Sequence, residues 1–251
     1  MNIKEYFKRI NFTSKVSLNI EVLFELQSNH LENIPFENLD IHYGSKIELN
    51  LDKIFDKIVT RKRGGFCYEL NSIFNELLIK IGFKTFLISA RVYNKNGTYG
   101  QEFDHMAIIV KIDTKLFLVD VGFGKFTFEP LEVKINQSQL DKYGTFMIDK
   151  WNNKYYRVNR LEHNEIIPEY IFELNEKQLI EFEEMCKFHQ LSHESHFTKN
   201  KVISISKPNG RITLTNTNLK ITEGDKTEIV YFNELEFDEY LYKYFNIQIE
   251  K

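Results

Sequence analysis

One cysteine lies where a nucleophile could form. Cys67 follows the glycine pair Gly64-Gly65, at the start of a segment with helical apolar spacing. Unpaired N–H groups and the helix dipole at such a start favour a thiolate, and would lower the thiol pKa from about 8.5 by one or more units. The two glycines would let the backbone approach a ligand closely. The alternative is a buried structural cysteine, since free cysteines are often buried.

A thiolate nucleophile needs a base, and the base needs an orienting group. His105 begins one apolar run, 105–110, and Asp120 ends the next, 116–120. If Asp113-Thr114 form a two-residue turn, residue 107 faces 120, and His105 and Asp120 become diagonal neighbours on one face. Diagonal residues lie roughly 7–8 Å apart, within the combined reach of an imidazole and a carboxylate. A carboxylate in an apolar strand is costly unless it is paired, so we expect these two side chains to pair.

The elements that would position these residues change in type along the chain. Helical spacing predicts helices from about Leu18 after a Ser17 cap, over 51–59, and over 66–81, the last ending before Gly82. Later patterns predict strands over 84–94, 105–112 and 116–123, a helix over 176–190, strands over 202–205, 211–215, 219–222 and 227–232, and a helix over 235–245. Helices, then strands, then a mixed end indicate an α+β fold.

The composition of the 251 residues excludes several classes of protein. Hydrophobic residues make up 42% and charged residues 27%, as in globular rather than disordered chains. The net charge is −3 and no basic block is present, so nucleic acid is not an expected partner. Apolar runs fall far short of the ~18 residues of a membrane span, and the start lacks a signal peptide's apolar region. We therefore expect a soluble, cytoplasmic protein with no membrane partner. Two cysteines are too few for a disulfide framework.

Together the motifs resemble the arylamine N-acetyltransferase family. The resemblance rests on four blocks in the family's order: Ile34-Pro35-Phe36-Glu37-Asn38-Leu39, Arg63-Gly64-Gly65-Phe66-Cys67-Tyr68-Glu69 with Asn71, His105-Met106-Ala107, and Asp120-Val121-Gly122-Phe123-Gly124 with Pro130-Leu131. The type of predicted secondary structure changes near residues 84 and 195. Together with these changes, the resemblance implies a helical domain over 1–83 that carries the nucleophile. A β-barrel domain over 84–195 would carry the histidine and aspartate, and an α/β lid would span 196–251. The catalytic core would be papain-like.

The resemblance also implies a reaction. Cys67 would take an acetyl group from acetyl-CoA, with His105 as base and Asp120 as orienting group. The thioester would then pass the acetyl group to an arylamine, arylhydrazine or arylhydroxylamine in a ping-pong scheme. Coenzyme A and a small-molecule acceptor are thus the expected partners. Gly124 would lie near the acyl site, and apolar surface for the acceptor could come from Phe36, Phe66, Phe123 and Phe126.

Other functions remain open on the sequence alone. The same Cys-His-Asp set also cleaves amides, as in a cysteine hydrolase or transglutaminase-like enzyme. A related amide synthase of a biosynthetic pathway would act on a larger substrate, and a non-catalytic binding protein would keep only the fold.

Charged and metal-ligating residues form three further patterns. We predict a buried ion pair between Glu37 and Arg63 that stabilises the loop before Cys67. The clearest basic cluster for the coenzyme A phosphates is Arg61-Lys62-Arg63, although such a cluster is more often a solvated turn. A third pattern consists of residue types that bind zinc: Cys186, His189, His193 and His196. Their spacing differs from the usual two-plus-two arrangement of a zinc site. We therefore expect no metal.

Overall fold

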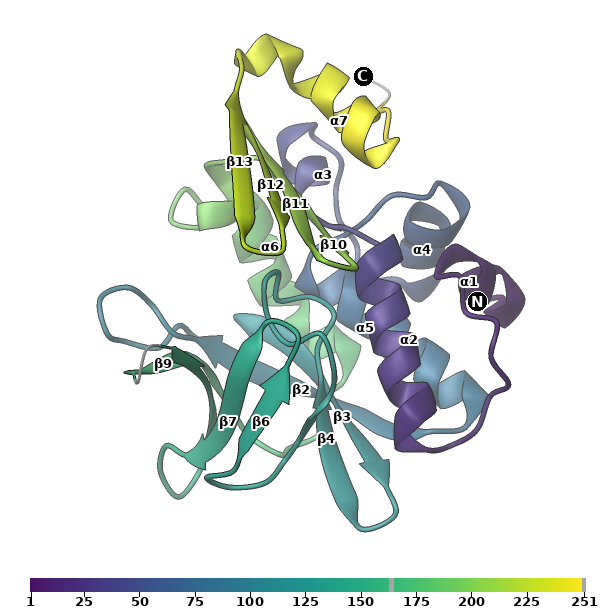
Figure 1. The fold of residues 1–251 in the computed structure, drawn as a ribbon, viewed down its shortest axis with the longest axis vertical. Helices are drawn as coiled ribbons and strands as arrows, with labels where there is room; N and C mark the ends of the chain where they lie inside the picture. Colours follow the sequence, from purple (N-terminus) through teal and green to yellow (C-terminus); the bar gives the residue numbers. More distant parts are fainter. Residues whose placement is uncertain (163–164, 250–251) are drawn as a thin grey trace.

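The computed structural model describes residues 1–162 and 165–249. Its N-terminal third is helical (Figure 1), with α1 (Ile3–Arg9), α2 (Ile20–Asn33), α3 (Leu39–His42), α4 (Leu51–Phe55), a π-helical turn (Asp56–Thr60) and α5 (Cys67–Ile81). The three predicted helices are present, but the predicted Ser17 cap is wrong. The Asn19 side chain caps α2 instead, because it accepts a hydrogen bond from the Val22 N–H at 3.0 Å.

The middle of the chain forms an eight-stranded antiparallel sheet in the order β5-β4-β3-β2-β9-β8-β7-β6. Its strands are β2 (Lys84–Val92), β3 (His105–Ile112), β4 (Lys115–Val119), β5 (Leu131–Glu132), β6 (Ser138–Asp141), β7 (Gly144–Lys150), β8 (Tyr156–Glu162) and β9 (Glu165–Phe172). The side-chain amide of Gln139 in β6 makes hydrogen bonds of 2.8 and 2.9 Å with the backbone of Glu132 in β5. The two edge strands are thereby joined, and the sheet nearly closes into a barrel.

The turn between β3 and β4 is the one that the sequence predicts. Ile112 pairs with Lys115 across Asp113-Thr114, and the register continues to Ile108 opposite Val119. β4 ends at Val119 and not at residue 123. Asp120 therefore follows the strand, at the start of the loop that leads to β5.

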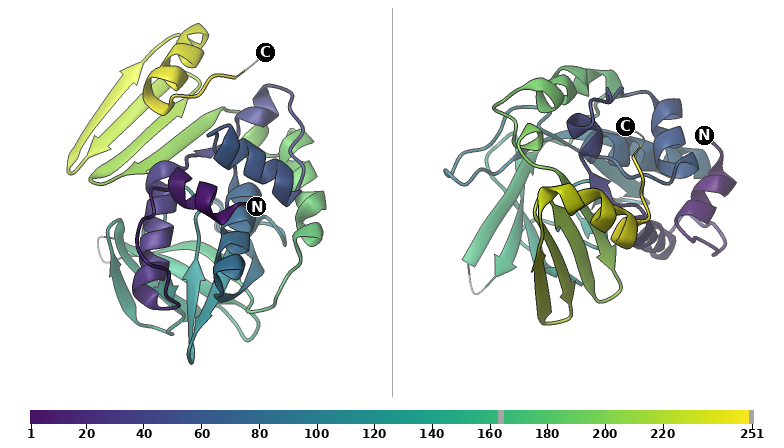
Figure 2. Two further views of the ribbon diagram at one scale, coloured as in Figure 1. Left: turned by 90° about the vertical axis from the view of Figure 1, so that its right-hand side faces the viewer. Right: turned by 90° about the horizontal axis from the view of Figure 1, so that it is seen from above.

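A second sheet, in the order β1-β10-β11-β12-β13, contains most of the C-terminal part. Four of its strands are β10 (Val202–Lys207), β11 (Gly210–Thr215), β12 (Asn218–Glu223) and β13 (Lys226–Tyr231). Helix α7 (Phe237–Phe245), after a 3-10 turn (Glu234–Glu236), covers one face of this sheet (Figure 2). The remaining strand, β1 (Phe36–Glu37), comes from the helical region and pairs with β10. The N-terminal and C-terminal regions therefore share one sheet.

Helix α6 connects the two sheets along the chain. It spans Glu183–Leu191, after a 3-10 turn over Leu179–Phe182, so regular structure begins three residues later than the predicted start at 176. A further 3-10 turn spans His196–Thr198. Across residues 1–162 and 165–249, no helix has the length and apolar character needed to cross a membrane.

Helix α5 lies at the centre of the molecule. It packs against β2 and β3 on one side and against α1 and α4 on another. Its apolar stripe is buried as predicted, but so are Glu69, Asn71 and Ser72 on its other faces. Buried polar groups need hydrogen-bond partners. The partners of Glu69 and Asn71 define the two polar networks around Cys67.

Candidate active site

Cys67 is the first residue of α5, and only 2% of its surface is exposed. The backbone amide of Met106, in β3, lies beside the Cys67 sulfur and acts to lower its pKa, against the effect of burial. His105 is the residue next to Met106 and the first of β3. The packing of α5 against β3 therefore brings the cysteine and the histidine to one place, although they are far apart in the sequence.

Gly122 lies directly against the backbone of Cys67. A Cβ atom at position 122 would be 2.7 Å from Cys67 Cα and 2.7 Å from Asn71 Nδ2. Ordinary van der Waals contact begins at about 3.4 Å, so a larger residue would displace its neighbours. The loop after Asp120 therefore approaches the backbone of the nucleophile closely at Gly122.

His105 and Asp120 form the predicted pair. Asp120 Oδ2 accepts a hydrogen bond from His105 Nε2 at 2.7 Å, and both side chains are buried. Because the carboxylate accepts at Nε2, a neutral ring carries its hydrogen there and its lone pair on Nδ1. Nδ1 is thus the nitrogen that can accept a proton.

The Asp120 carboxylate accepts three further hydrogen bonds. Oδ2 accepts from the Tyr170 hydroxyl at 3.1 Å, and Oδ1 accepts from Asn71 Nδ2 at 3.0 Å and from the Gly122 N–H at 2.9 Å. Burial and the nearby Asp120 raise the pKa of Tyr170 well above its ordinary value, so the phenol keeps its hydrogen and donates. These donors fix the orientation of the carboxylate and, through it, of the imidazole.

The expected lowering of the Cys67 pKa is wrong. Burial raises the pKa of this thiol well above its ordinary value, and the charge of Asp120 acts in the same direction. A helix dipole contributes only about 0.3–1 kcal/mol at most surface sites, less than one pKa unit, whereas full burial can shift a pKa by several units. Burial thus opposes formation of the Cys67 thiolate, and the nucleophile needs a base to take its proton.

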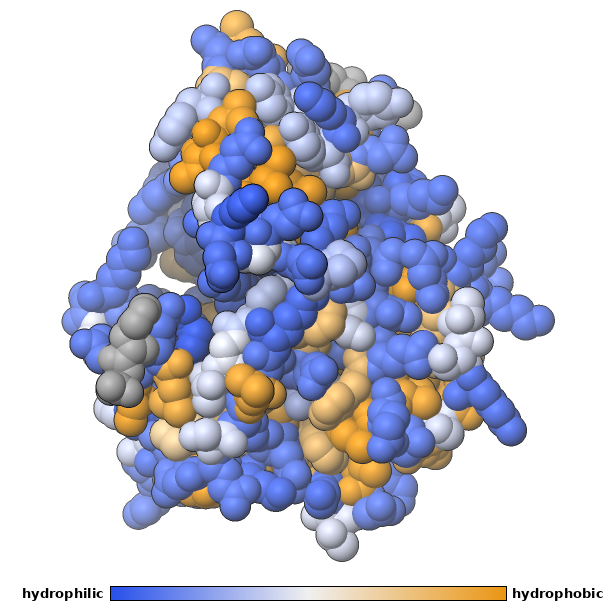
Figure 3. Space-filling view, viewed as in Figure 1, coloured by the Kyte–Doolittle hydropathy of each residue, from blue (hydrophilic) through white to orange (hydrophobic). Residues whose placement is uncertain are grey.

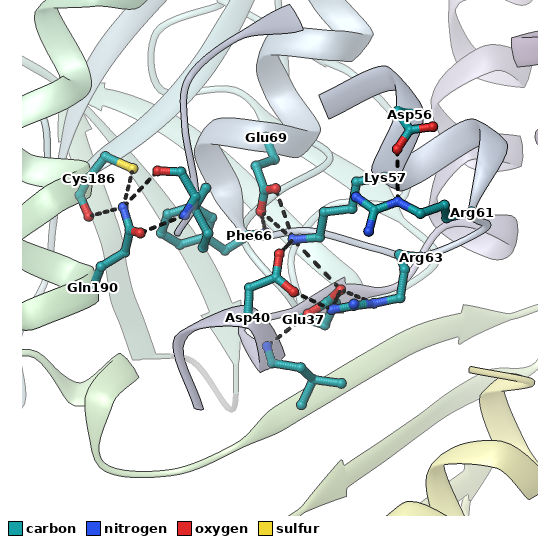
Figure 4. Close-up of polar contacts among 12 residues, drawn as sticks. Glu37, Asp40, Asp56, Lys57, Arg61, Arg63, Phe66, Glu69, Cys186 and Gln190 are labelled. Atoms are coloured by element: carbon teal, nitrogen blue, oxygen red, sulfur yellow. Dashed lines mark hydrogen bonds and ion pairs between the residues drawn. The ribbon is translucent and has the colours of Figure 1, made fainter. Parts of the chain in front are cut away.

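A cluster of buried charges supports the loop before Cys67 (Figure 4). The predicted pair is confirmed: Arg63 donates to Glu37 Oε1 from Nε at 3.0 Å and from Nη2 at 2.7 Å. Arg63 Nη2 also donates to Asp40 at 2.8 Å, and Lys57 Nζ lies 2.8 Å from the other oxygen of Asp40. The cluster is therefore larger than a pair.

Lys57 extends this cluster to the helix of the nucleophile. Its Nζ donates to both oxygens of Glu69, at 2.9 and 3.0 Å, and Glu69 Oε2 accepts a hydrogen bond from the Phe66 N–H at 3.1 Å. Burial alone would lower the pKa of Lys57, but the carboxylates of Glu37, Glu69 and Asp40 outweigh it and raise that pKa. Burial raises the pKa of Glu69. The cluster thus anchors the residue that precedes Cys67.

Gly64 and Gly65 pack closely against other parts of the protein. A Cβ at Gly64 would lie 2.0 Å from the Pro35 carbonyl oxygen, and one at Gly65 would lie 2.8 Å from the Glu69 Cβ. The Glu37 N–H donates to the Gly65 carbonyl at 2.8 Å. The two glycines therefore allow close packing against the segment of Pro35 to Glu37 and against α5, while their predicted approach to a ligand stays a prediction.

The aromatic residues expected near the site differ in exposure. Phe123 is half-buried, with its ring centroid 4.9 Å from that of His105. Phe36 is also half-buried, and its ring lies 6.2 Å from that of Phe197. Phe66 is fully buried, 6.0 Å from Phe197, and Phe126 is buried against Phe123. Only Phe36 and Phe123 among the four predicted residues retain substantial exposed surface.

The second cysteine and its neighbouring histidines have separate contacts. Cys186 Sγ lies 3.3 Å from Gln190 Nε2, and burial raises the Cys186 pKa to about 12. His189 Nδ1 lies 3.0 Å from the Ser195 hydroxyl, while the His196 ring lies on Phe197 at 3.9 Å. Within the described part of the chain, no group of three or more His, Cys, Asp or Glu side chains is arranged to hold a metal.

Comparisons with known proteins bear on this geometry. A family model described as N-acetyltransferase matches residues 19–251. Arylamine N-acetyltransferase 1 of Bos taurus is 34% identical, with 100% of this chain and 96% of that protein covered, and arylamine N-acetyltransferase 2 of Mus musculus is 32% identical over the same shares. The crystal structure of arylamine N-acetyltransferase C from Bacillus anthracis superimposes with a TM-score of 0.90 at 25% identity, covering 98% of each chain. The Bacillus cereus enzyme, described as having a Cys-His-Glu catalytic triad, also gives a TM-score of 0.90, at 24% identity and with 98% of each chain covered.

Proposed function

The chain belongs to the arylamine N-acetyltransferase family, and from that premise we propose that Cys67, His105 and Asp120 carry acetyl groups from acetyl-CoA to an arylamine-type nitrogen. The observation that supports the proposal most strongly is the 2.7 Å hydrogen bond between His105 and Asp120 beside the buried Cys67. The Bacillus cereus relative has glutamate as the third member of its triad. In this chain aspartate occupies the equivalent role, with four donors to hold it.

The first half-reaction loads the enzyme. His105 Nδ1 takes the proton of the Cys67 thiol as the sulfur attacks the acetyl carbonyl, and the Met106 N–H stabilises the charge that develops on the sulfur. Unpaired N–H groups in the first turn of α5 are available to stabilise the oxyanion. The bond between the acetyl carbon and the donor's sulfur then breaks, and the imidazolium returns its proton to the departing coenzyme A thiolate. An acetyl thioester remains on Cys67.

The second half-reaction transfers the acetyl group to the acceptor and regenerates the free Cys67 thiol. The acceptor nitrogen attacks the thioester, His105 accepts the proton that the nitrogen loses, and the Cys67 thiolate leaves and regains a proton from the imidazolium. Phe36, Phe123 and the backbone at Gly124 supply the acceptor's surroundings, while the buried Phe66 supports Phe197 from behind. Acceptors in this proposal are arylamines, arylhydrazines and arylhydroxylamines.

Acetyl loading tests the proposal directly. Incubation with acetyl-CoA followed by intact-mass measurement should show one acetyl group on Cys67, and an arylamine or arylhydrazine added afterwards should remove it. His105→Ala should abolish loading, and Asp120→Asn should slow it severely because the imidazole loses its orientation. Cys186→Ser is the matched control and should load at the unmodified protein's rate.

Two results would overturn this assignment. Loading at full rate in His105→Ala would remove the base from the mechanism. Peptide cleavage without any acetyl adduct would instead favour a hydrolase built on the same three residues.

A further inference from the structure

The hydroxyl of Tyr68, the residue after Cys67, lies in the interior of the protein. Hydrophilic residues cover most of the face shown in Figure 3, so a polar group inside the protein is an exception that needs a partner. The Tyr68 side chain is fully buried. Burial raises the pKa of its phenol well above the ordinary value, so the hydroxyl keeps its hydrogen and acts as a donor.

This hydroxyl binds the segment that precedes the base. Tyr68 Oη donates to the Phe103 carbonyl at 2.6 Å and lies 3.3 Å from the Asp104 carbonyl. These are the two residues before His105. One side chain therefore joins α5, which begins with the nucleophile, to the start of β3, which begins with the base.

Phe103 has a backbone conformation that phenylalanine rarely adopts. The Asp104 N–H donates to the Gln101 carbonyl at 3.3 Å, so residues 101–104 form a turn. Phe103, the third residue of this turn, has a φ of 65°, in the left-handed region that glycine and asparagine favour. Of the five other non-glycine residues with positive φ in the described part of the chain, four are asparagine or aspartate and one is Lys62. Phe103 therefore needs contacts from its surroundings to keep this conformation.

Three side chains from other elements supply these contacts. Tyr68 binds the Phe103 carbonyl, and the Phe103 N–H donates to the Ser89 hydroxyl, in β2, at 2.7 Å. His189, in α6, stacks on the Tyr68 ring with the centroids 6.1 Å apart, and its Nε2 lies 3.3 Å from an Asp104 carboxylate oxygen. The turn is thus held at its carbonyl, at its N–H and at the next side chain.

We propose that Tyr68 is a positioning residue for the base: its hydroxyl holds the Phe103 turn in the conformation that orients His105 toward Cys67. The proposal rests on the function proposed above, in which His105 takes the thiol proton. Asp120 orients the imidazole through Nε2, whereas the turn sets the backbone from which the imidazole projects. Without the hydroxyl, Phe103 would relax toward the negative φ values that phenylalanine prefers, and His105 would move with it.

Alkylation of Cys67 by iodoacetamide tests the orientation of the base without any acyl donor. A Cys186→Ser background leaves Cys67 as the single thiol. In that background, Tyr68→Phe should slow alkylation about 10-fold, since a misplacement of 1 Å at a reacting centre can cost about 100-fold. His105→Ala gives the rate without the base, and the Tyr68→Phe rate should lie above it. Ser89→Ala removes the other backbone contact of the turn and should give a loss of the same kind.

Two comparisons separate positioning from a general loosening of the structure. Tyr6, in α1, is also fully buried, and its hydroxyl lies 2.9 Å from His30 Nδ1, in α2, so Tyr6→Phe is the matched control and should be alkylated at the normal rate. In a His105→Ala background, Tyr68→Phe should cause no further loss, because the hydroxyl acts through the base. An equal loss in Tyr6→Phe, a further loss without His105, or a normal rate in Tyr68→Phe would each overturn the proposal.

Acetyl loading tests the same step with the proposed donor. In Tyr68→Phe, the loading rate at saturating acetyl-CoA should fall about 10-fold, while the acetyl-CoA concentration that gives half of this rate should stay the same. A higher half-saturating concentration at an unchanged maximal rate would mean that Tyr68 serves donor binding, and the positioning role would be wrong. If the unmodified protein does not load from acetyl-CoA but Tyr68→Phe still slows alkylation, the proposed function fails and the positioning role stands.

Discussion

Gly122→Ala should slow acetyl loading strongly without unfolding the protein. The added Cβ would lie 2.7 Å from Cys67 Cα and from Asn71 Nδ2, short of an ordinary contact by about 0.7 Å. Because the first of these atoms is backbone and the second is buried, neither can rotate away, and α5 and the loop must separate. Overpacking of this kind costs roughly 1–3 kcal/mol. A misplacement of 1 Å at a reacting centre can cost about 100-fold in rate, so a shift of this size predicts roughly a 10- to 100-fold slower loading.

The assay is the single-turnover rate of Cys67 acetylation by intact mass, measured well below the melting temperature. Leu241→Ala, in the core between α7 and the C-terminal sheet, is the stability control, since it should cost about 2–5 kcal/mol far from the site. That variant should load at the normal rate. A Gly122→Ala protein that is folded and loads as fast as the unmodified protein would refute the reasoning.

Three further predictions concern stability. Tyr170→Phe should lower the free energy of unfolding by about 1.5–3 kcal/mol, because it removes a hydrogen bond to a buried carboxylate, whereas Tyr156→Phe should have little effect in the same urea titration. Lys57→Met should cost about 3–5 kcal/mol, since it leaves buried carboxylates without their partner, and a loss below 1 kcal/mol would contradict the role of the charge cluster. Burial lowers the pKa of His30 to about 3. Between pH 6.5 and 3, His30 is therefore protonated in the unfolded chain but stays neutral in the folded protein. Stability should therefore fall by about 1.4 kcal/mol per pH unit between pH 6.5 and 3 from this group, and His30→Gln should show a correspondingly flatter dependence in urea unfolding at pH 7.5, 5.5 and 4.5.

Local patterns in the sequence predicted the parts of the site that depend on neighbouring residues. The Asp113-Thr114 turn sets the register of β3 and β4, and that register places His105 and Asp120 together. The position of Cys67 at a helix start follows from Gly64-Gly65 and the apolar spacing after it. Both features could be predicted from the residue spacing of helices and strands and from the length of one turn.

Features that depend on packing between distant segments could not be predicted in this way. Tyr170 reaches Asp120 from β9, 50 residues away, and no local pattern distinguishes its hydroxyl from those of the other tyrosines. The raised pKa of Cys67 depends on how completely β3 and the Gly122 loop cover α5. Lys57 and Glu69 looked like ordinary polar positions on helices, and their burial follows from the way that β1 lies against the Gly64-Gly65 loop.

The place of β1 in the C-terminal sheet also bears on how the chain is made. Asn38, next to β1, accepts a hydrogen bond from the Val202 N–H across 164 residues, and its amide donates to the carbonyls of Phe197 and Asn200. During synthesis the N-terminal part emerges first. β1 therefore cannot pair until β10, which begins at residue 202, has been synthesised. Until then a strand edge beside the loop of the reactive cysteine stays open, and pairings over such distances form slowly. A chain cut short before residue 202 would keep its nucleophile yet lose this partner, and would be prone to aggregate through the open edge.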